Sequence, residues 1–301
     1  MNTRSWRSRG PGGPAAAFLA FALVAGGCGG GDDANPASVS PAPSPPASSA
    51  DPGRPVGVVA IGHSGLTGAG SDRSLPRQAA PENSWATGTS SEVNSIYRRL
   101  VAVRPVTEGH VANTAEGGAS ASVLTAQVRR ALEIVPVPAL VVVQTIDNDI
   151  RCDGTDREHV PEFGAALAEA LEVVSTTSPN SRILVVGQLA RPSPSFVEKV
   201  VAEDPTVQAS LTGTGECDFY GPDGRLVQEH FDTLTSIIED YEAEQARVCA
   251  TVPNCGTDDG ARAAYVDRLE NFSSDWNHLN VRGQAEAAKI AWPVVAAQLE
   301  L

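Results

Sequence analysis

The sequence predicts a doubly wound α/β domain built on a parallel sheet, and three observations support this. Short apolar runs at residues 56–61, 139–143 and 183–186 are typical of strands buried on both faces. Longer stretches between and after them repeat apolar residues every three or four positions, as amphipathic helices do. Strands that alternate with helices imply βαβ crossovers, which join parallel neighbours.

Apolar stripes define three predicted helices. The first carries Leu124, Val128, Ala131 and Val135, and Pro136 ends it. The other two stripes are Phe163, Leu167, Leu171 and Val174, and then Val281, Ala285, Ala288, Trp292, Val295 and Leu299, with Pro293 inside the last. Two irregular stretches, 67–90 and 212–224, interrupt this pattern. Each is a candidate pocket wall, although a plain surface insertion fits equally well.

The first 55 residues carry the features of an export signal and a tether. Residues 1–27 combine three arginines, a short apolar run and terminal small residues, which predicts a secretory signal peptide. Cys28 follows directly, so we expect a lipidated cysteine or, alternatively, ordinary cleavage that leaves it unmodified. Residues 28–55 are rich in Gly, Pro and Ser, which predicts a disordered tether before a single domain at 56–301.

Four further cysteines fit an exported protein. Cys249 and Cys255 are close in sequence and are expected to pair, which leaves Cys152 with Cys217. Zinc is the rival interpretation, but the sequence has no Cys-x-x-Cys pair or histidine cluster to support it. We therefore expect a protein of the cell envelope, lipid-anchored at Cys28 or otherwise secreted.

The charge of the chain limits its partners. Residues 1–27 contain three of the 22 basic residues and none of the 36 acidic ones, so the mature chain carries a net charge of −17. A protein this acidic repels nucleic acid and other polyanions. We expect a monomer whose only membrane contact is the possible anchor at Cys28.

Candidate catalytic residues follow the predicted strands, because ligands of open α/β sheets bind beyond the carboxyl ends of the strands. Ser64 lies in Gly62-His63-Ser64-Gly65, directly after the first strand. A loop with Gly117 and Gly118 precedes the helix that carries Leu124, and its backbone N–H groups are candidate oxyanion donors. Each segment taken alone also fits an ordinary turn.

Two more segments complete the set. Asn148 follows the strand at 139–143, and its amide is a neutral donor that can stabilise negative charge. Asp275 lies three residues before His278, a spacing that lets the carboxylate bind Nδ1–H and leaves Nε2 free to accept a proton. Turn or helix capping is the alternative for both. Together the residues supply a nucleophile, a base, its orienting acid and oxyanion donors, which serine hydrolysis needs without any metal or cofactor.

The ordered set of Gly-x-Ser, Gly, Asn-Asp and Asp-x-x-His resembles the SGNH (GDSL) hydrolases from about Val56 to Leu301. This resemblance implies a flavodoxin-like three-layer α/β/α sandwich with a mainly parallel sheet. It also implies a catalytic triad of Ser64, His278 and Asp275, and an oxyanion hole formed by the N–H groups of Ser64 and Gly118 with the Asn148 amide. The family has four sequence blocks, marked by the serine, the glycine, the asparagine and the histidine. Gly117 is the alternative donor, although Gly118 fits the glycine of the second block better.

Three departures from the family pattern matter. His63 replaces the aspartate of Gly-Asp-Ser, the glycine usual near Asn148 is missing because Ile146 and Asp147 precede it, and the first inter-block segment is long. Proton transfer does not involve His63, so activity is expected to survive. The resemblance implies hydrolysis of an acyl ester, whether a short-chain ester, a lipid or an acetylated carbohydrate.

Other classes fit less well. An α/β-hydrolase has its serine in mid-chain within Gly-x-Ser-x-Gly, and a metal-dependent hydrolase needs clustered Asp and His ligands. A catalytically silent surface binding protein is the main alternative, supported by His63 and the altered third block. Trp85 and Trp276 are candidate substrate contacts, with plain burial of aromatic area favoured.

Overall fold

The computed structural model describes residues 54–72, 74–75 and 77–301. The predicted signal peptide at 1–27, Cys28 and residues 29–53 of the predicted tether lie outside the described residues. None of the helices in the described part combines the length and the hydropathy that a bilayer crossing needs.

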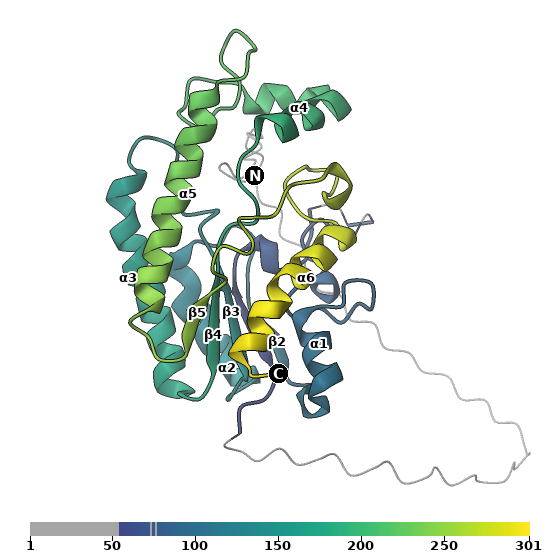
Figure 1. Ribbon diagram of the computed structural model, residues 1–301, viewed down its shortest axis with the longest axis vertical. Coiled ribbons are helices and arrows are strands. Elements are labelled where there is room, and N and C mark those ends of the chain that lie inside the picture. The colour runs from purple at the N-terminus through teal and green to yellow at the C-terminus, as the bar shows by residue number, and fades with distance from the viewer. Residues whose placement is uncertain (1–53, 73, 76) are drawn as a thin grey trace, which may run out of the picture. The chain divides into compact units, whose positions relative to one another are not determined.

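A five-stranded parallel sheet forms the centre of the domain (Figure 1). The strands are β1 (Val58–Gly62), β2 (Val111–Asn113), β3 (Leu140–Gln144), β4 (Arg182–Val186) and β5 (Cys255–Thr257). Their spatial order is β2-β1-β3-β4-β5, which is the flavodoxin-like order of doubly wound sheets. The predicted fold class is therefore confirmed.

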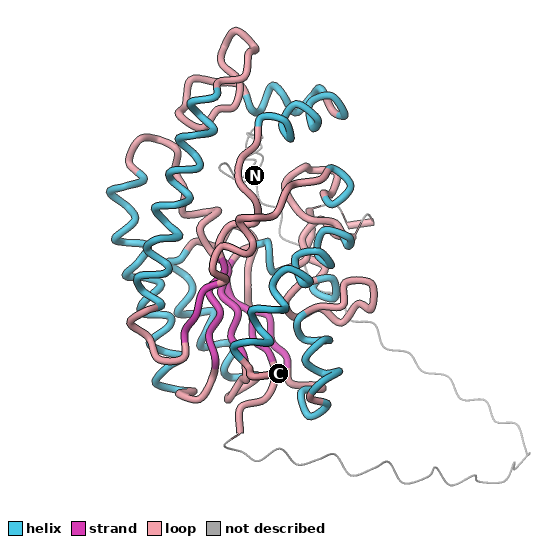
Figure 2. Tube along the Cα trace, in the orientation of Figure 1, coloured by secondary structure: helices cyan, strands magenta, loops and turns pink. Residues whose placement is uncertain are grey.

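Helices cover both faces of the sheet, as Figure 2 shows. One face is covered by the helices α2 (Leu124–Ile134), α3 (Asp156–Thr177) and α5 (Gln228–Cys249). The other face is covered by α1 (Ile96–Val103) and α6 (Val281–Gln298). A further helix, α4 (Pro194–Glu203), packs in a smaller apolar cluster with Phe272.

Alternation along the strands explains why both faces are covered. Val59 and Ile61 of β1 contribute to the core under α2, α3 and α5, whereas Val58 and Ala60 contribute to the core under α1 and α6. Successive strand side chains point to opposite faces, so a strand that is apolar at every position needs cover on both sides.

The predicted strands and helices are confirmed to within one or two residues, except that α3 extends well beyond its apolar stripe. Pro293 lies inside α6, which continues to Gln298. The sequence analysis did not identify β2, β5, α1, α4 or α5. The two strands have only three residues each, too few to form a recognisable apolar run.

Both predicted disulfides are present. Cys152 pairs with Cys217 across 65 positions, and Cys249 pairs with Cys255 across six. The first joins the loop after β3 to the segment before α5, and the second ties the end of α5 to the start of β5. The zinc interpretation is wrong for these four cysteines, because each of them is in a disulfide.

The two disulfides should differ in their contribution to stability, because a cross-link that closes a longer loop restricts the unfolded chain more. We expect Cys152→Ser/Cys217→Ser to lower the free energy of unfolding by about 4 kcal/mol and Cys249→Ser/Cys255→Ser by about 2 kcal/mol. Guanidinium denaturation of both double variants measures the difference. An equal loss in the two variants would contradict the loop-length explanation.

Candidate active site

Ser64 is held at the carboxyl end of β1 by a tightly fixed turn. Gly62 has φ 137°, and a Cβ there would lie 1.8 Å from the carbonyl oxygen of Gln144, so only glycine fits. The side chain of Gln127 from α2 binds both backbone groups of Gly62, accepting from N–H at 2.6 Å and donating to the carbonyl oxygen at 3.0 Å. A short 3₁₀ turn, Ser64–Leu66, then begins at the nucleophile.

His63 caps this turn. Its Nδ1 accepts the backbone N–H of Gly65 at 3.1 Å, so the neutral ring carries its proton on Nε2, which lies 3.4 Å from Asp147 Oδ2. Burial of the ring lowers the pKa of His63, although Asp147 partly opposes this shift. A short polar side chain that accepts N–H at a helix start is an ordinary cap. His63 therefore supports the turn that carries Ser64 and forms no hydrogen bond with the Ser64 hydroxyl.

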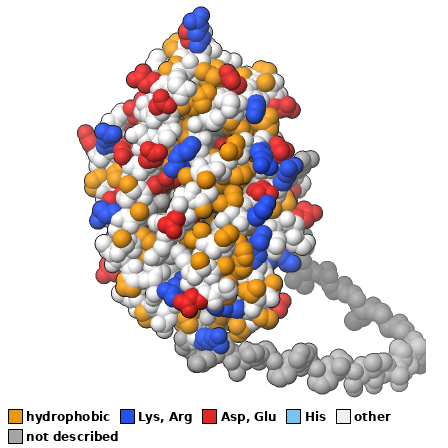
Figure 3. Space-filling view, viewed as in Figure 1, with side chains coloured by type: hydrophobic (Ala, Val, Ile, Leu, Met, Phe, Trp, Pro, Cys, Tyr) orange, Lys and Arg blue, Asp and Glu red, His pale blue; other side chains and the backbone are white. Residues whose placement is uncertain are grey.

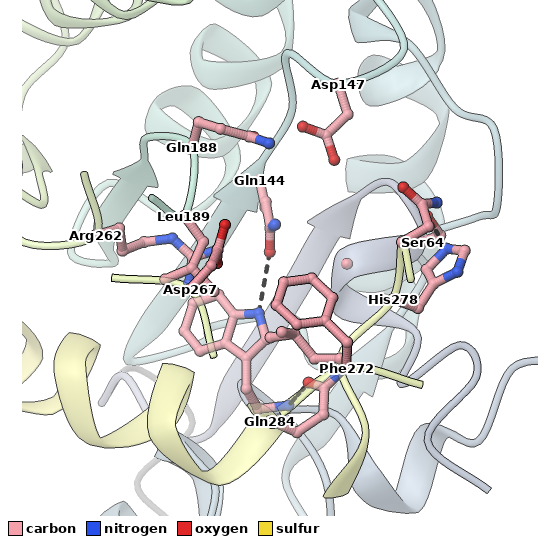
Figure 4. A pocket seen from close by; sticks show the side chains of 14 residues that line it. Ser64, Gln144, Asp147, Gln188, Leu189, Arg262, Asp267, Phe272, His278 and Gln284 are labelled. Carbon is pink, nitrogen blue, oxygen red and sulfur yellow. Dashed lines mark hydrogen bonds between the residues drawn. The ribbon is translucent and has the colours of Figure 1, made fainter. Parts of the chain in front are cut away.

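The structure joins Ser64, His278 and Asp275 in one hydrogen-bonded chain. His278 Nε2 lies 2.9 Å from Ser64 Oγ, and His278 Nδ1 lies 2.8 Å from Asp275 Oδ2. Figure 4 shows Ser64 and His278 next to each other at one end of a pocket. With Nδ1–H donated to the carboxylate, Nε2 is the acceptor for the Ser64 proton.

Asp275 is fixed as a carboxylate by its own turn. Its Oδ1 accepts from the Ser273 hydroxyl at 2.6 Å and from the backbone N–H groups of Asn277 and His278 at 3.0 Å each. Burial raises the pKa of Asp275, but the hydrogen bonds from His278 and Ser273 outweigh it and hold this pKa well below its usual value. Asp275 is therefore ionised at neutral pH and accepts the Nδ1–H of His278 as a carboxylate.

The start of α6 positions this turn against the rest of the site. Asn280 caps the helix by accepting the Gly283 N–H, and its amide donates to the carbonyl oxygen of Phe272 at 2.8 Å. Gln284, one turn into α6, accepts the backbone N–H of Trp85 at 3.0 Å. The helix thus holds the loop before it and the long segment after β1 together.

The predicted oxyanion donors lie in neighbouring loops. Among the described residues, neither the Ser64 nor the Gly118 backbone N–H donates a hydrogen bond, so both are available to a ligand. Asn148 Nδ2 donates to the Ala119 carbonyl oxygen at 3.0 Å, which ties the loop after β3 to the loop that contains Gly118. An amide nitrogen has two hydrogens, so this bond leaves one donor.

Ile146 and Asp147 precede Asn148, where the pattern that the sequence resembles has a glycine, and Ile146 has an unusual backbone conformation. Its φ is 99°, in the left-handed region that a β-branched side chain rarely adopts. Asp149 holds the turn by accepting from the Thr145 hydroxyl at 2.9 Å and from the Ala121 N–H at 2.9 Å. The side chain of Ile146 is fully buried in the core, and its burial offsets the strained backbone.

A small pocket opens beside Ser64 and His278, with a cavity volume of about 50 Å³. Trp85 contributes to its wall and is otherwise fully buried, so the segment 67–90 supplies part of the pocket, which is one of the two alternatives that its sequence left open. Trp276 packs with Phe196 and Phe272 in the smaller apolar cluster and does not line this pocket. No residue of the segment 212–224 lines it either.

The polar residues of the pocket that the sequence analysis missed include Gln144, Gln188, Arg262 and Asp267. Gln144 is the last residue of β3, and Gln188 comes two residues after β4, so the strand-end rule could have identified both. Arg262 and Asp267 lie in an irregular segment with no pattern that would have signalled them. No group of three metal-ligating side chains occurs among the described residues.

Comparison with known proteins yields structural similarities only. No protein-family profile and no curated protein matches the chain. The extracellular lipase of Streptomyces rimosus superposes with a TM-score of 0.49 at 16% identity, covering 81% of this chain and 99% of the lipase. Phospholipase A1 of Streptomyces albidoflavus NA297 superposes with a TM-score of 0.47 at 13% identity, covering 81% of this chain and 100% of the phospholipase. The acetyl xylan esterase Est2A of Butyrivibrio proteoclasticus superposes with a TM-score of 0.47 at 13% identity, covering 81% of this chain and 64% of the esterase. Likeness this distant says nothing of the chemistry, which rests on the geometry above.

The cap at His63 can be tested by introducing the aspartate of the Gly-Asp-Ser pattern that this segment resembles. We expect His63→Asp to destabilise the protein by about 1–3 kcal/mol, because it places a second buried carboxylate beside Asp147. His63→Asn keeps a neutral acceptor for Gly65 N–H and should cost less. Adding Asp147→Asn to His63→Asp should recover part of the loss. Urea denaturation measures all four proteins, and equal stability of the Asp and Asn variants would contradict this assignment.

Proposed function

We propose that this protein is a serine ester hydrolase of the SGNH type. The observation that carries the proposal is the unbroken chain from Ser64 Oγ through the His278 ring to Asp275, at the carboxyl edge of the parallel sheet. A binding protein that keeps only the fold has no need of this arrangement. The acyl ester as substrate comes from the family resemblance of the sequence motifs.

In the proposed reaction, His278 Nε2 removes the Ser64 hydroxyl proton as Oγ attacks the ester carbonyl carbon. Asp275 holds the ring in the required tautomer and stabilises the imidazolium that forms. The tetrahedral intermediate collapses when His278 returns the proton to the departing alcohol oxygen, which leaves an acyl group on Ser64. Water then attacks the acyl carbon while His278 takes one of its protons, and His278 returns that proton to Ser64 Oγ as the carboxylic acid leaves.

The proposed oxyanion hole consists of the N–H groups of Ser64 and Gly118 with the side-chain amide of Asn148. The first two donors are unused among the described residues, and Asn148 is tied to the loop of the second. Donors fixed before the reaction stabilise the developing negative charge without reorganisation.

We also propose that the protein is exported, anchored through Cys28 or else secreted, and acts as a monomer. The basic and apolar leader at 1–27 supports export, and the two disulfides fit an oxidising compartment. Acidic and basic side chains are interspersed over the face seen in Figure 3, with no basic cluster there that would attract a polyanion.

The nucleophile can be identified with a fluorophosphonate probe. We expect the probe to label the wild-type protein and not Ser64→Ala, because only an activated serine attacks it. His278→Ala should lower ester turnover by at least ~10³-fold, as loss of a triad member does. Ser122→Ala, a change at an exposed serine, is the matched control and should label normally. Labelling that persists in Ser64→Ala would place the nucleophile elsewhere.

The size of the pocket predicts a preference for short acyl groups. A cavity of about 50 Å³ holds only a few water-sized groups, so a long alkyl chain has no buried space beside Ser64. We expect kcat/KM for p-nitrophenyl esters to be highest for acetate or propionate and to fall at least ~10-fold by octanoate. Rising activity with chain length would contradict this.

A further inference from the structure

Arg262 lines the pocket beside Ser64 and His278, and its guanidinium has hydrogen-bond donors that no described residue accepts. Its side chain is fully buried, and the guanidinium stacks over the Trp85 ring at 4.9 Å from the ring centroid. Figure 4 shows it on the side of the pocket opposite Ser64 and His278. The single hydrogen bond that this guanidinium donates to described residues runs from Nε to the Gly187 carbonyl oxygen at 3.0 Å.

The remaining donors of Arg262 have no partner in the described part of the chain. Nη1 is completely buried and makes no hydrogen bond there. An unsatisfied buried charged donor is costly, so such groups are normally paired. The backbone of Arg262 is itself fixed, since its N–H donates to Asp258 Oδ2 at 3.0 Å and Asp258 also accepts the Gly187 N–H. The donor is thus held in place for an acceptor that comes from outside.

The surroundings of this donor select the kind of acceptor. Asp258, Asp147 and Glu242 all act electrostatically on the guanidinium, so its positive charge is already offset. Asp267 lines the same pocket, and burial raises its pKa to about 6, which leaves it mostly ionised at pH 8. An anionic group that approached Arg262 would meet these carboxylates. A neutral oxygen would not be repelled.

The other polar groups of the pocket complete a mixed set. Gln144 uses its Oε1 to accept the Trp85 indole N–H at 3.0 Å, and its Nε2 is turned toward Gly65 beside the nucleophile. Gln188 lines the same pocket and lies next to Gln144 in Figure 4. Donors on Arg262 and Gln144, acceptors on the carboxylates and the aromatic face of Trp85 match a group that both accepts and donates, which is a hydroxyl.

We propose that Arg262, Gln144, Gln188 and Asp267 form a subsite for one hydroxyl group of the alcohol part of the substrate. The cavity of about 50 Å³ holds this hydroxyl and a short acyl group, and the rest of the alcohol lies outside it, so the preferred substrates are short-chain esters of uncharged polyols. A hydroxyl oxygen accepts from Arg262 Nη1, and its hydrogen is donated to a pocket carboxylate. This proposal rests on the proposed esterase function and assigns the specificity of the same pocket.

The test compares three acetates that share an acyl group: an acetylated neutral monosaccharide, butyl acetate and an acetylated glucuronate. We expect kcat/KM for the neutral sugar ester to exceed that for butyl acetate by at least about tenfold, with the glucuronate ester poorer than the neutral one. Arg262→Met, which keeps the side-chain length, should raise KM for the sugar ester at least about tenfold and change butyl acetate less than about threefold. Arg268→Met, an exposed change outside the pocket, is the matched control.

Equal turnover of sugar and butyl esters, preference for the glucuronate, or an unchanged sugar KM in folded Arg262→Met would each overturn the proposal. If Arg262→Met does not fold, Asp267→Ala replaces it, and an unchanged KM there overturns the proposal. Binding of the sugar acetate to full-length Ser64→Ala, measured by saturation-transfer NMR with and without Arg262→Met, tests the subsite even if the wild type hydrolyses none of the esters. Inactivity with retained, Arg262-dependent binding would reject the esterase function and keep the subsite.

Discussion

The hydrogen bond between His278 Nε2 and Ser64 Oγ joins residues 214 positions apart, and much of the domain serves to bring them together. β1 delivers Ser64 to the sheet edge, and α6 holds the turn of Asp275 and His278 over it. Two glutamine side chains fix the segments around the site by hydrogen bonds. Gln127 from α2 binds both backbone groups of Gly62, and Gln284 from α6 binds the backbone N–H of Trp85. Each is buried, so an unpaired amide would be costly.

Two departures from the motif pattern that the sequence resembles have local physical explanations. His63 caps the turn that carries Ser64 through Nδ1, at a place where a carboxylate would lie beside Asp147. Burial lowers the pKa of the His63 ring, which favours its uncharged form. Ile146 accepts a backbone conformation suited to glycine because its side chain fills the core between sheet and helices. Neither change alters the path of the proton from Ser64 to His278.

Prediction from sequence succeeded where a pattern is local. The strands β1, β3 and β4 are apolar at nearly every position, and the helices α2 and α6 have regular apolar stripes. The sequence therefore predicted these elements and the buried face of each helix. β2 and β5 are too short for a pattern, and they exist because a neighbouring strand offers its hydrogen-bonding edge. In the site, Ser64 and His278 follow motifs, whereas Arg262 becomes significant only through Trp85 and Gly187, which are distant in sequence.

The edge strand β5 has a partner on one side only, β4. Its first residue, Cys255, is covalently tied to the last residue of α5. An exposed strand edge is a surface on which other chains can add strands. The disulfide between Cys249 and Cys255 holds β5 against α5, and we expect it to limit aggregation through this edge. Recombinant material made in a reducing cytoplasm would lack this protection, and aggregates there would reflect the compartment of synthesis rather than a defect of the fold.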